Sequence, residues 1–71
     1  MTASDLFVHN LKYVMDSQSI TTAELARRLN VKRPSVSVVV SGQEGVTLDR
    51  AGRIAKAVGY PLASLIGGKL G

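Results

Sequence analysis

The chain has 71 residues, a length that suits a single domain. Hydrophobic residues make up 45% of it, which argues against global disorder, and the absence of cysteine excludes disulfides and thiolate metal sites. Nine basic and five acidic residues leave a formal net charge of +4, an excess that favours polyanionic partners.

The features of membrane and secreted proteins are also missing from the sequence. No apolar run approaches the roughly 18 residues that span a bilayer. Residues 1–5 lack the basic segment of a secretory signal. We therefore expect a soluble, cytoplasmic protein that does not contact a membrane.

The first predicted helix runs from about Asp5 to Ser17, with Ser4 as its N-cap. Asp5 is favourable at the positive end of the helix dipole. Four apolar residues recur at helical spacing and form one stripe: Phe7, Leu11, Val14 and Met15. We expect this stripe to face the core.

A capping box predicts that a second helix begins at Thr22. The Thr21 hydroxyl is expected to accept from the amide of Glu24, and the Glu24 carboxylate to accept in return from the amide of Thr21. The helix should end at Asn30, because asparagine tolerates the left-handed backbone of a tight turn. Its inner face consists of Leu25, Ala26 and Leu29.

The residues after Asn30 lead into a third predicted helix. Val31 is expected to be a buried plug, and Lys32 or Arg33 begins the helix. Pro34 suits the first turn, where a missing amide donor costs little.

The rest of this third segment is ambiguous between helix and strand. Residues 35–40 include four valines, and propensity alone favours a strand. The i, i+3, i+4 spacing of Val36, Val39 and Val40, together with the stop at Gly42, favours a helix instead. We predict a helix.

Thr47 caps a fourth predicted helix, which ends at Gly59. Its apolar face consists of Leu48, Ala51, Ile54, Ala55 and Val58. A short fifth helix is expected over about Leu62 to Ile66. Five predicted helices make the fold class all-α, in one domain over residues 1–66 followed by a flexible tail over 67–71.

The segment from Thr22 to Val40 is the most informative about function. It combines a capped helix, a short turn and a second helix with polar and basic residues on one face. Residues 33, 37 and 41 are four apart, as are 34 and 38, so they share a face. A helix of this kind fits the major groove of DNA, with its N-terminal residues nearest the base edges.

The run from Glu24 to Ser37, followed by Ser41-Gly42, resembles the lambda-repressor-like helix-turn-helix family of Cro and phage-repressor proteins. Residues 48–50, 54–59 and Leu65 are similar to the later helices of that family. The resemblance covers about residues 5–66. It implies a compact five-helix bundle that binds operator DNA as a homodimer, with its third helix in the major groove, and regulates transcription, most simply as a repressor of phage or prophage type.

The resemblance also implies which residues meet DNA. By position, the residues that face the bases are Arg33, Pro34, Ser37 and Val38. The residues expected near the phosphates are Thr22, Lys32, Ser41 and Gln43. Many members of the family have glutamine or serine where this chain has Arg33 and Pro34, so the operator sequence cannot be taken from a relative.

The chemistry of single side chains leaves alternatives open within this set. Arg33 can donate two hydrogen bonds to a guanine, clamp a phosphate, or remain solvated. Val38 can contact a thymine methyl group or pack as an ordinary valine. Ser35 can cap the helix or contact a phosphate.

The C-terminal apolar residues are candidates for a dimer contact, because two-fold dimers use the same surface on both partners. This set comprises Tyr60, Leu62, Leu65 and Ile66. The alternative is that Leu62 and Leu65 only close the core. Arg50, Arg53 and Lys56 form either a second basic rim or, through Asp49, an ordinary ion-paired helix face.

Nothing in the sequence indicates an enzyme. His9 is the only histidine and has no partner at metal-ligand spacing. There is no nucleophile–base pair and no phosphate-binding glycine loop, so we expect no cofactor, metal or small-molecule substrate.

Two other functional classes remain open. One is an antitoxin that binds a toxin partner and autoregulates its operon, with the C-terminal apolar residues as the toxin contact. The other is an adaptor of the same fold that does not bind DNA by itself.

Overall fold

A computed structural model describes residues 2–43 and 45–70, and this part of the chain forms five helices and no strand. They are α1 (Ala3–Ser17), α2 (Thr22–Leu29), α3 (Arg33–Val40), α4 (Leu48–Val58) and α5 (Leu62–Ile66). The all-α, five-helix prediction is therefore confirmed. Within the described ranges, no helix is both long enough and apolar enough to cross a membrane.

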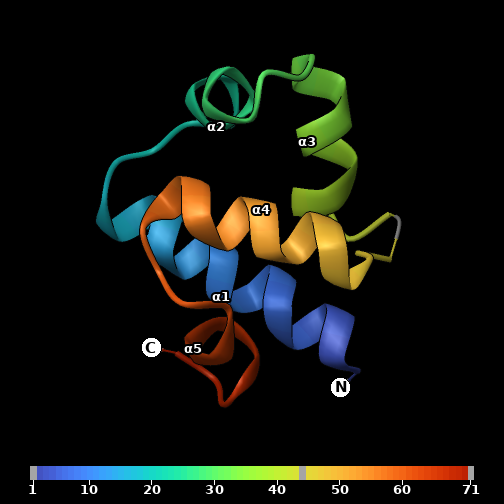
Figure 1. Cartoon of the computed structure of the whole chain (residues 1–71), viewed down its shortest axis with the longest axis vertical. Helices are drawn as coiled ribbons and strands as arrows, with labels where there is room; N and C mark the ends of the chain where they lie inside the picture. Colours follow the sequence, from blue (N-terminus) through green and yellow to red (C-terminus); the bar gives the residue numbers. More distant parts are fainter. Residues whose placement is uncertain (1, 44, 71) are drawn as a thin grey trace.

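The helices surround a single apolar core. In Figure 1, α1 and α4 cross the middle of the molecule, α2 and α3 occupy one end, and α5 occupies the other. All five helices contribute the largest fully buried apolar side chains, which are Phe7, Leu11, Val14, Leu25, Val39, Ile54 and Leu65. The α2–α3 corner is thus supported from below by α4 and α1.

The start of α1 differs from the prediction. Thr2 is the N-cap instead of Ser4, because the Thr2 hydroxyl accepts from the Asp5 amide at 3.1 Å and the Asp5 carboxylate accepts from the Thr2 amide at 3.2 Å. These bonds hold the pKa of Asp5 below its ordinary value. The Ser4 hydroxyl instead accepts from the Val46 amide at 3.2 Å and so connects α1 to the segment before α4.

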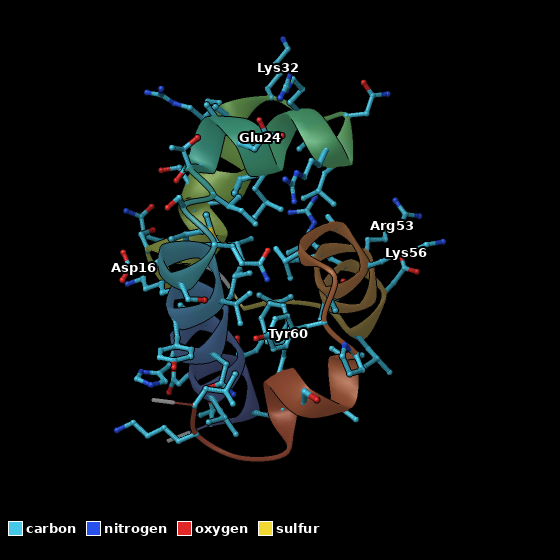
Figure 2. All side chains as sticks on the ribbon, turned by 90° about the vertical axis from the view of Figure 1, so that its left-hand side faces the viewer. Asp16, Glu24, Lys32, Arg53, Lys56 and Tyr60 are labelled. Atoms are coloured by element: carbon cyan, nitrogen blue, oxygen red, sulfur yellow. The ribbon has the colours of Figure 1, made fainter. Side chains whose placement is uncertain are left out.

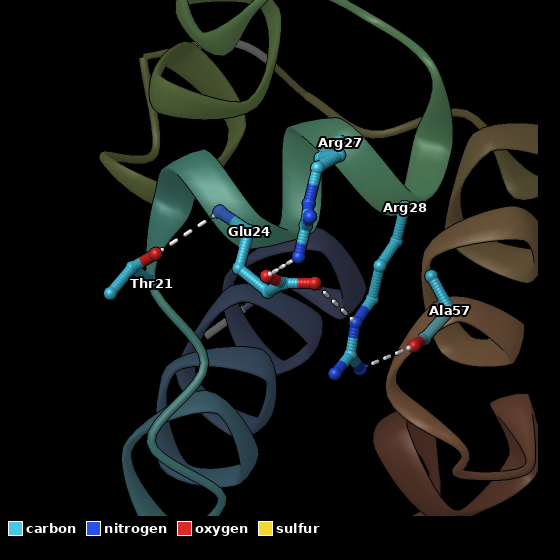
Figure 3. Close-up of polar contacts among 5 residues, drawn as sticks. All are labelled: Thr21, Glu24, Arg27, Arg28 and Ala57. Atoms are coloured by element: carbon cyan, nitrogen blue, oxygen red, sulfur yellow. Dashed lines mark hydrogen bonds and ion pairs between the residues drawn. The ribbon is translucent and has the colours of Figure 1, made fainter.

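Only half of the predicted capping box forms at α2. The Thr21 hydroxyl accepts from the Glu24 amide at 3.0 Å, as expected. The Glu24 carboxylate does not return to Thr21 but pairs with Arg27 and Arg28, which lowers its pKa (Figure 3). Arg28 also donates to the carbonyl of Ala57 at 3.0 Å, so this cluster joins α2 to α4.

Asn10 is the one buried polar side chain of the described residues, and it connects α1 to the C-terminal segment. Its amide nitrogen donates to the carbonyls of Leu65 at 2.7 Å and Gly68 at 2.8 Å. Its oxygen accepts from the Leu70 amide at 2.8 Å. The segment that the sequence predicted as a flexible tail thus contacts α1 at two positions beyond α5.

Two apolar residues predicted to be buried are exposed instead. Val31 is 42% exposed, because the turn that binds its amide to the carbonyl of Ala26 directs the side chain outward. Leu48 is 73% exposed, because it begins α4 at the rim of the core, where few side chains can cover it. Both residues enlarge the apolar surface of the molecule.

Candidate nucleic-acid interface

The corner between α2 and α3 is fixed by backbone hydrogen bonds. Asn30 adopts the left-handed conformation, with φ 57° and ψ 44°, and its amide bonds to the carbonyl of Arg27 at 3.1 Å. The Val31 amide bonds to the carbonyl of Ala26 at 3.0 Å. The buried Ala26 allows α2 and α3 to cross steeply, as Figure 1 shows. The predicted asparagine turn is confirmed.

The third segment is a helix despite its valines. Val36 and Val39, three residues apart, are both buried in the core, a pattern that a strand does not give. Pro34 lies in the first turn, as predicted. Core packing therefore overrides the strand propensity of the segment.

The end of α3 is also defined by the backbone. Gly42 has a positive φ of 77°, and its amide bonds to the carbonyl of Val39 at 3.1 Å. The Gln43 amide bonds to the carbonyl of Val38 at 3.1 Å. The chain therefore turns away sharply after two helical turns and places Gln43 directly after the exposed end of α3.

Most residues predicted to meet DNA are exposed around α3. The exposed ones are Lys32, Arg33, Pro34, Ser37, Ser41 and Gln43. Thr22, Ser35 and Val38 are half-buried, and Val38 packs against the edge of the core. Only part of the Val38 side chain is therefore available to a thymine methyl group.

Positive charge gathers at the start of α3. Lys32 is the N-cap and makes no side-chain capping bond, and Arg33 follows as the first helical residue. Neither side chain forms an ion pair with residues 2–43 or 45–70. Figure 2 shows Lys32 projecting from the tip of the molecule. These two cations are therefore available to an anion.

The start of α2 provides a second place for an anion. Thr22 and Ala23 are the first residues of the helix, and amides in this position precede the first intrahelical hydrogen bond. Such amides, at the positive end of the helix dipole, suit a phosphate oxygen. Thr22 thus has the position that its predicted role requires.

Several of the remaining basic residues form ion pairs. Arg27 and Arg28 both pair with Glu24. Arg53 pairs with Asp49 at 3.4 Å, so the ion-paired reading of this helix face holds for Arg53.

The predicted dimer residues divide between core and surface. Leu65 is fully buried against α1 and α4, so its side chain cannot reach a second molecule, and we remove it from that set. Tyr60 and Leu62 are half-buried, and Ile66 is 41% exposed. Sequence reasoning missed Leu48, which shares an apolar groove with Ile66 and Leu62, because helical spacing assigned Leu48 to the core.

Comparison with known proteins agrees with this geometry. A family model described as helix-turn-helix, of the lambda-repressor-like kind, matches residues 11–65. The match includes both helices of the corner, all of α4 and most of α5. No curated protein and no solved structure was found to match the chain.

Proposed function

The chain belongs to the lambda-repressor-like helix-turn-helix family, and from this we propose that it is a homodimeric repressor, of phage or prophage type, that places α3 in the major groove of an operator half-site. DNA binding in the regulation of transcription is the function typical of the family. The observation that supports our more specific proposal is the exposed face of α3, which begins with the two cations Lys32 and Arg33.

In this proposal the residues divide by what they contact. Arg33 donates to a guanine edge, and the small Pro34 and Ser37 let the helix approach the bases closely. The exposed part of Val38 meets a thymine methyl group. The phosphate contacts are Thr22, Lys32, Ser35, Ser41 and Gln43, which position the protein without specifying sequence.

The proposed dimer uses the apolar groove at the end of the molecule near α5. Leu48 and Ile66 are its exposed members and Leu62 is at its wall, whereas Tyr60 is not among its lining residues. A two-fold contact brings the same groove of both copies together. The α3 helices of the two copies would then lie roughly 34 Å apart, which is one turn of DNA.

Selection of bound sites from a random duplex pool tests the proposal directly. We expect two related half-sites in inverted orientation, with centres about 10 base pairs apart. Affinity should fall steeply as salt rises, because phosphate contacts release counterions. Failure to bind any duplex at low salt would contradict the proposal, and recovery of a single half-site would contradict the dimer.

The same apolar groove also supports a second candidate function, an antitoxin that binds a toxin and autoregulates its operon. In that case Leu48 and Ile66 would contact the toxin, not a second copy. Sedimentation equilibrium separates the two: a dimer at micromolar concentration supports the repressor, whereas a monomer that still binds DNA favours the antitoxin.

A further inference from the structure

A second basic surface lies on the outer side of α4, apart from the exposed face of α3. Arg50, Arg53 and Lys56 are three residues apart and therefore share one face of the helix. Arg28 of α2 lies against the end of the same helix through its bond to the carbonyl of Ala57. Figure 2 shows Arg53 and Lys56 pointing outward from α4. We call these four side chains the α4 basic ridge.

A small apolar pocket lies beside this ridge, between α4 and the α2–α3 corner. Leu29, Val31 and Ile54 provide apolar walls, and Arg50 and Arg53 line it as well. Ile54 is buried, whereas both arginines and Val31 are exposed. The pocket therefore has an apolar base and a rim that is partly cationic.

The volume of the pocket limits what can occupy it. It measures about 60 Å³. A single water needs roughly 10–15 Å³ of such space, so the pocket holds about the atoms of one branched aliphatic side chain. Sites for metabolites and cofactors are typically about 300–1,000 Å³. The occupant that fits is one side chain of a larger partner.

The charges of the ridge favour an acidic partner. Arg50 and Lys56 form no ion pair with the residues that the structure describes. Arg53 pairs with Asp49, but these side chains are 76% and 79% exposed, so the pair is weak and can exchange for another carboxylate. Three cations are thus accessible to incoming carboxylates.

A DNA backbone would satisfy these cations but not the pocket. Phosphodiesters have no aliphatic side chain, so a DNA backbone would leave the exposed Val31 uncovered and the pocket next to it empty. An acidic peptide segment with one aliphatic residue satisfies both features. The pocket therefore favours the acidic peptide over the DNA backbone.

We infer that the α4 basic ridge and its pocket form a docking site for an acidic segment of a partner protein, which adjoins the proposed operator contacts at Ser35. One leucine, isoleucine or valine of the partner enters the pocket beside Val31 and Ile54. Carboxylates on either side of it pair with Arg50, Arg53 and Lys56.

The test uses the full chain, labelled with ¹⁵N, and a synthetic peptide with one leucine between two short runs of glutamate. We expect chemical-shift changes centred on Val31, Ile54 and Arg53. Replacing the leucine of the peptide by serine should weaken binding about tenfold or more, because the buried aliphatic group is lost.

Protein variants then separate the ridge from general positive charge. The double change Arg53→Ser with Lys56→Ser should weaken peptide binding about fivefold. The matched control, Lys12→Ser with Lys69→Ser, removes the same charge from exposed positions elsewhere and should have a much smaller effect. All four side chains are exposed, so both double variants should fold.

Three results would overturn the inference. The serine peptide could bind as tightly as the leucine peptide, or the control variant could lose as much affinity as the ridge variant. Alternatively, the ridge variant could lose affinity for a mixed-sequence duplex and keep its affinity for the peptide. That last result would assign the ridge to the DNA interface.

Discussion

Replacing Asn10 by alanine should strongly destabilise the fold. The side chain is fully buried and makes hydrogen bonds of 2.7, 2.8 and 2.8 Å to Leu65, Gly68 and Leu70. A net contribution of about 1 kcal/mol for each bond gives a loss of about 3 kcal/mol. A domain of this length has a free energy of unfolding of roughly 4–11 kcal/mol, so the loss is a large fraction of it.

Urea unfolding followed by far-ultraviolet circular dichroism measures this loss. With a slope of about 1 kcal/mol per molar urea, which is typical of small domains, the midpoint should fall by about 3 M. Lys12→Ala is the control, because Lys12 is exposed on the same helix and its removal should change stability by less than about 0.5 kcal/mol.

Asn10→Asp is a second test of the same hydrogen bonds. Aspartate keeps the oxygen that accepts from Leu70, but it places a second oxygen against the carbonyls of Leu65 and Gly68. It should therefore be less stable than alanine at neutral pH, and protonation at acidic pH should restore part of the loss. The reasoning is refuted if alanine costs less than about 1 kcal/mol, or if aspartate is as stable as asparagine.

Three further predictions concern the interface and the helix ends. Arg33→Ala should relax discrimination at one base pair, at a cost of about 1–3 kcal/mol, whereas Lys32→Ala should weaken binding to all duplexes alike. Fluorescence anisotropy with a panel of duplexes measures both effects, and equal losses across sequences for Arg33→Ala would contradict its base contact. Because the pKa of Glu24 is lowered in the folded state, its ion pairs stabilise the fold above its ordinary pKa and cease to do so as pH falls through the folded value. The difference in melting temperature between wild type and Glu24→Gln should therefore shrink from about pH 6 to about pH 3. A constant difference would argue against the ion pairs. Gly67→Ala should lower the melting temperature, since a Cβ there would lie 2.6 Å from the carbonyl oxygen of Ala63. Gly68→Ala is the control, because a Cβ at that position meets nothing within 4 Å. Equal melting temperatures for the two variants would refute the clash.

The elements of the fold followed from local patterns in the sequence. Val36 and Val39 are three apart and Gly42 follows them, so the third segment could be predicted as a helix against its propensity. Asn30 marked the turn because asparagine tolerates a left-handed backbone. These signals lie within a few residues of each other, and they predict local structure well.

Features that depend on distant neighbours could not be predicted in this way. Leu48 has the spacing of a core residue, but its exposure depends on whether other helices reach the first turn of α4. The partners of Asn10 are backbone carbonyls and an amide at the far end of the chain, which have no sequence signature. The pocket beside Val31 likewise depends on how α4 packs under the corner.

The eight residues of α3 limit how much of an operator one copy can distinguish. At a rise of 1.5 Å per residue the helix is about 12 Å long, and with base pairs about 3.4 Å apart it spans three or four of them. A four-base-pair word occurs by chance about once in 256 positions, and a genome offers roughly 10⁶ or more competing sites. Two such words at a fixed spacing reduce the chance to about one in 65,000. The proposed dimer would therefore recognise its operator through the distance between its two copies of α3 as much as through any single side chain.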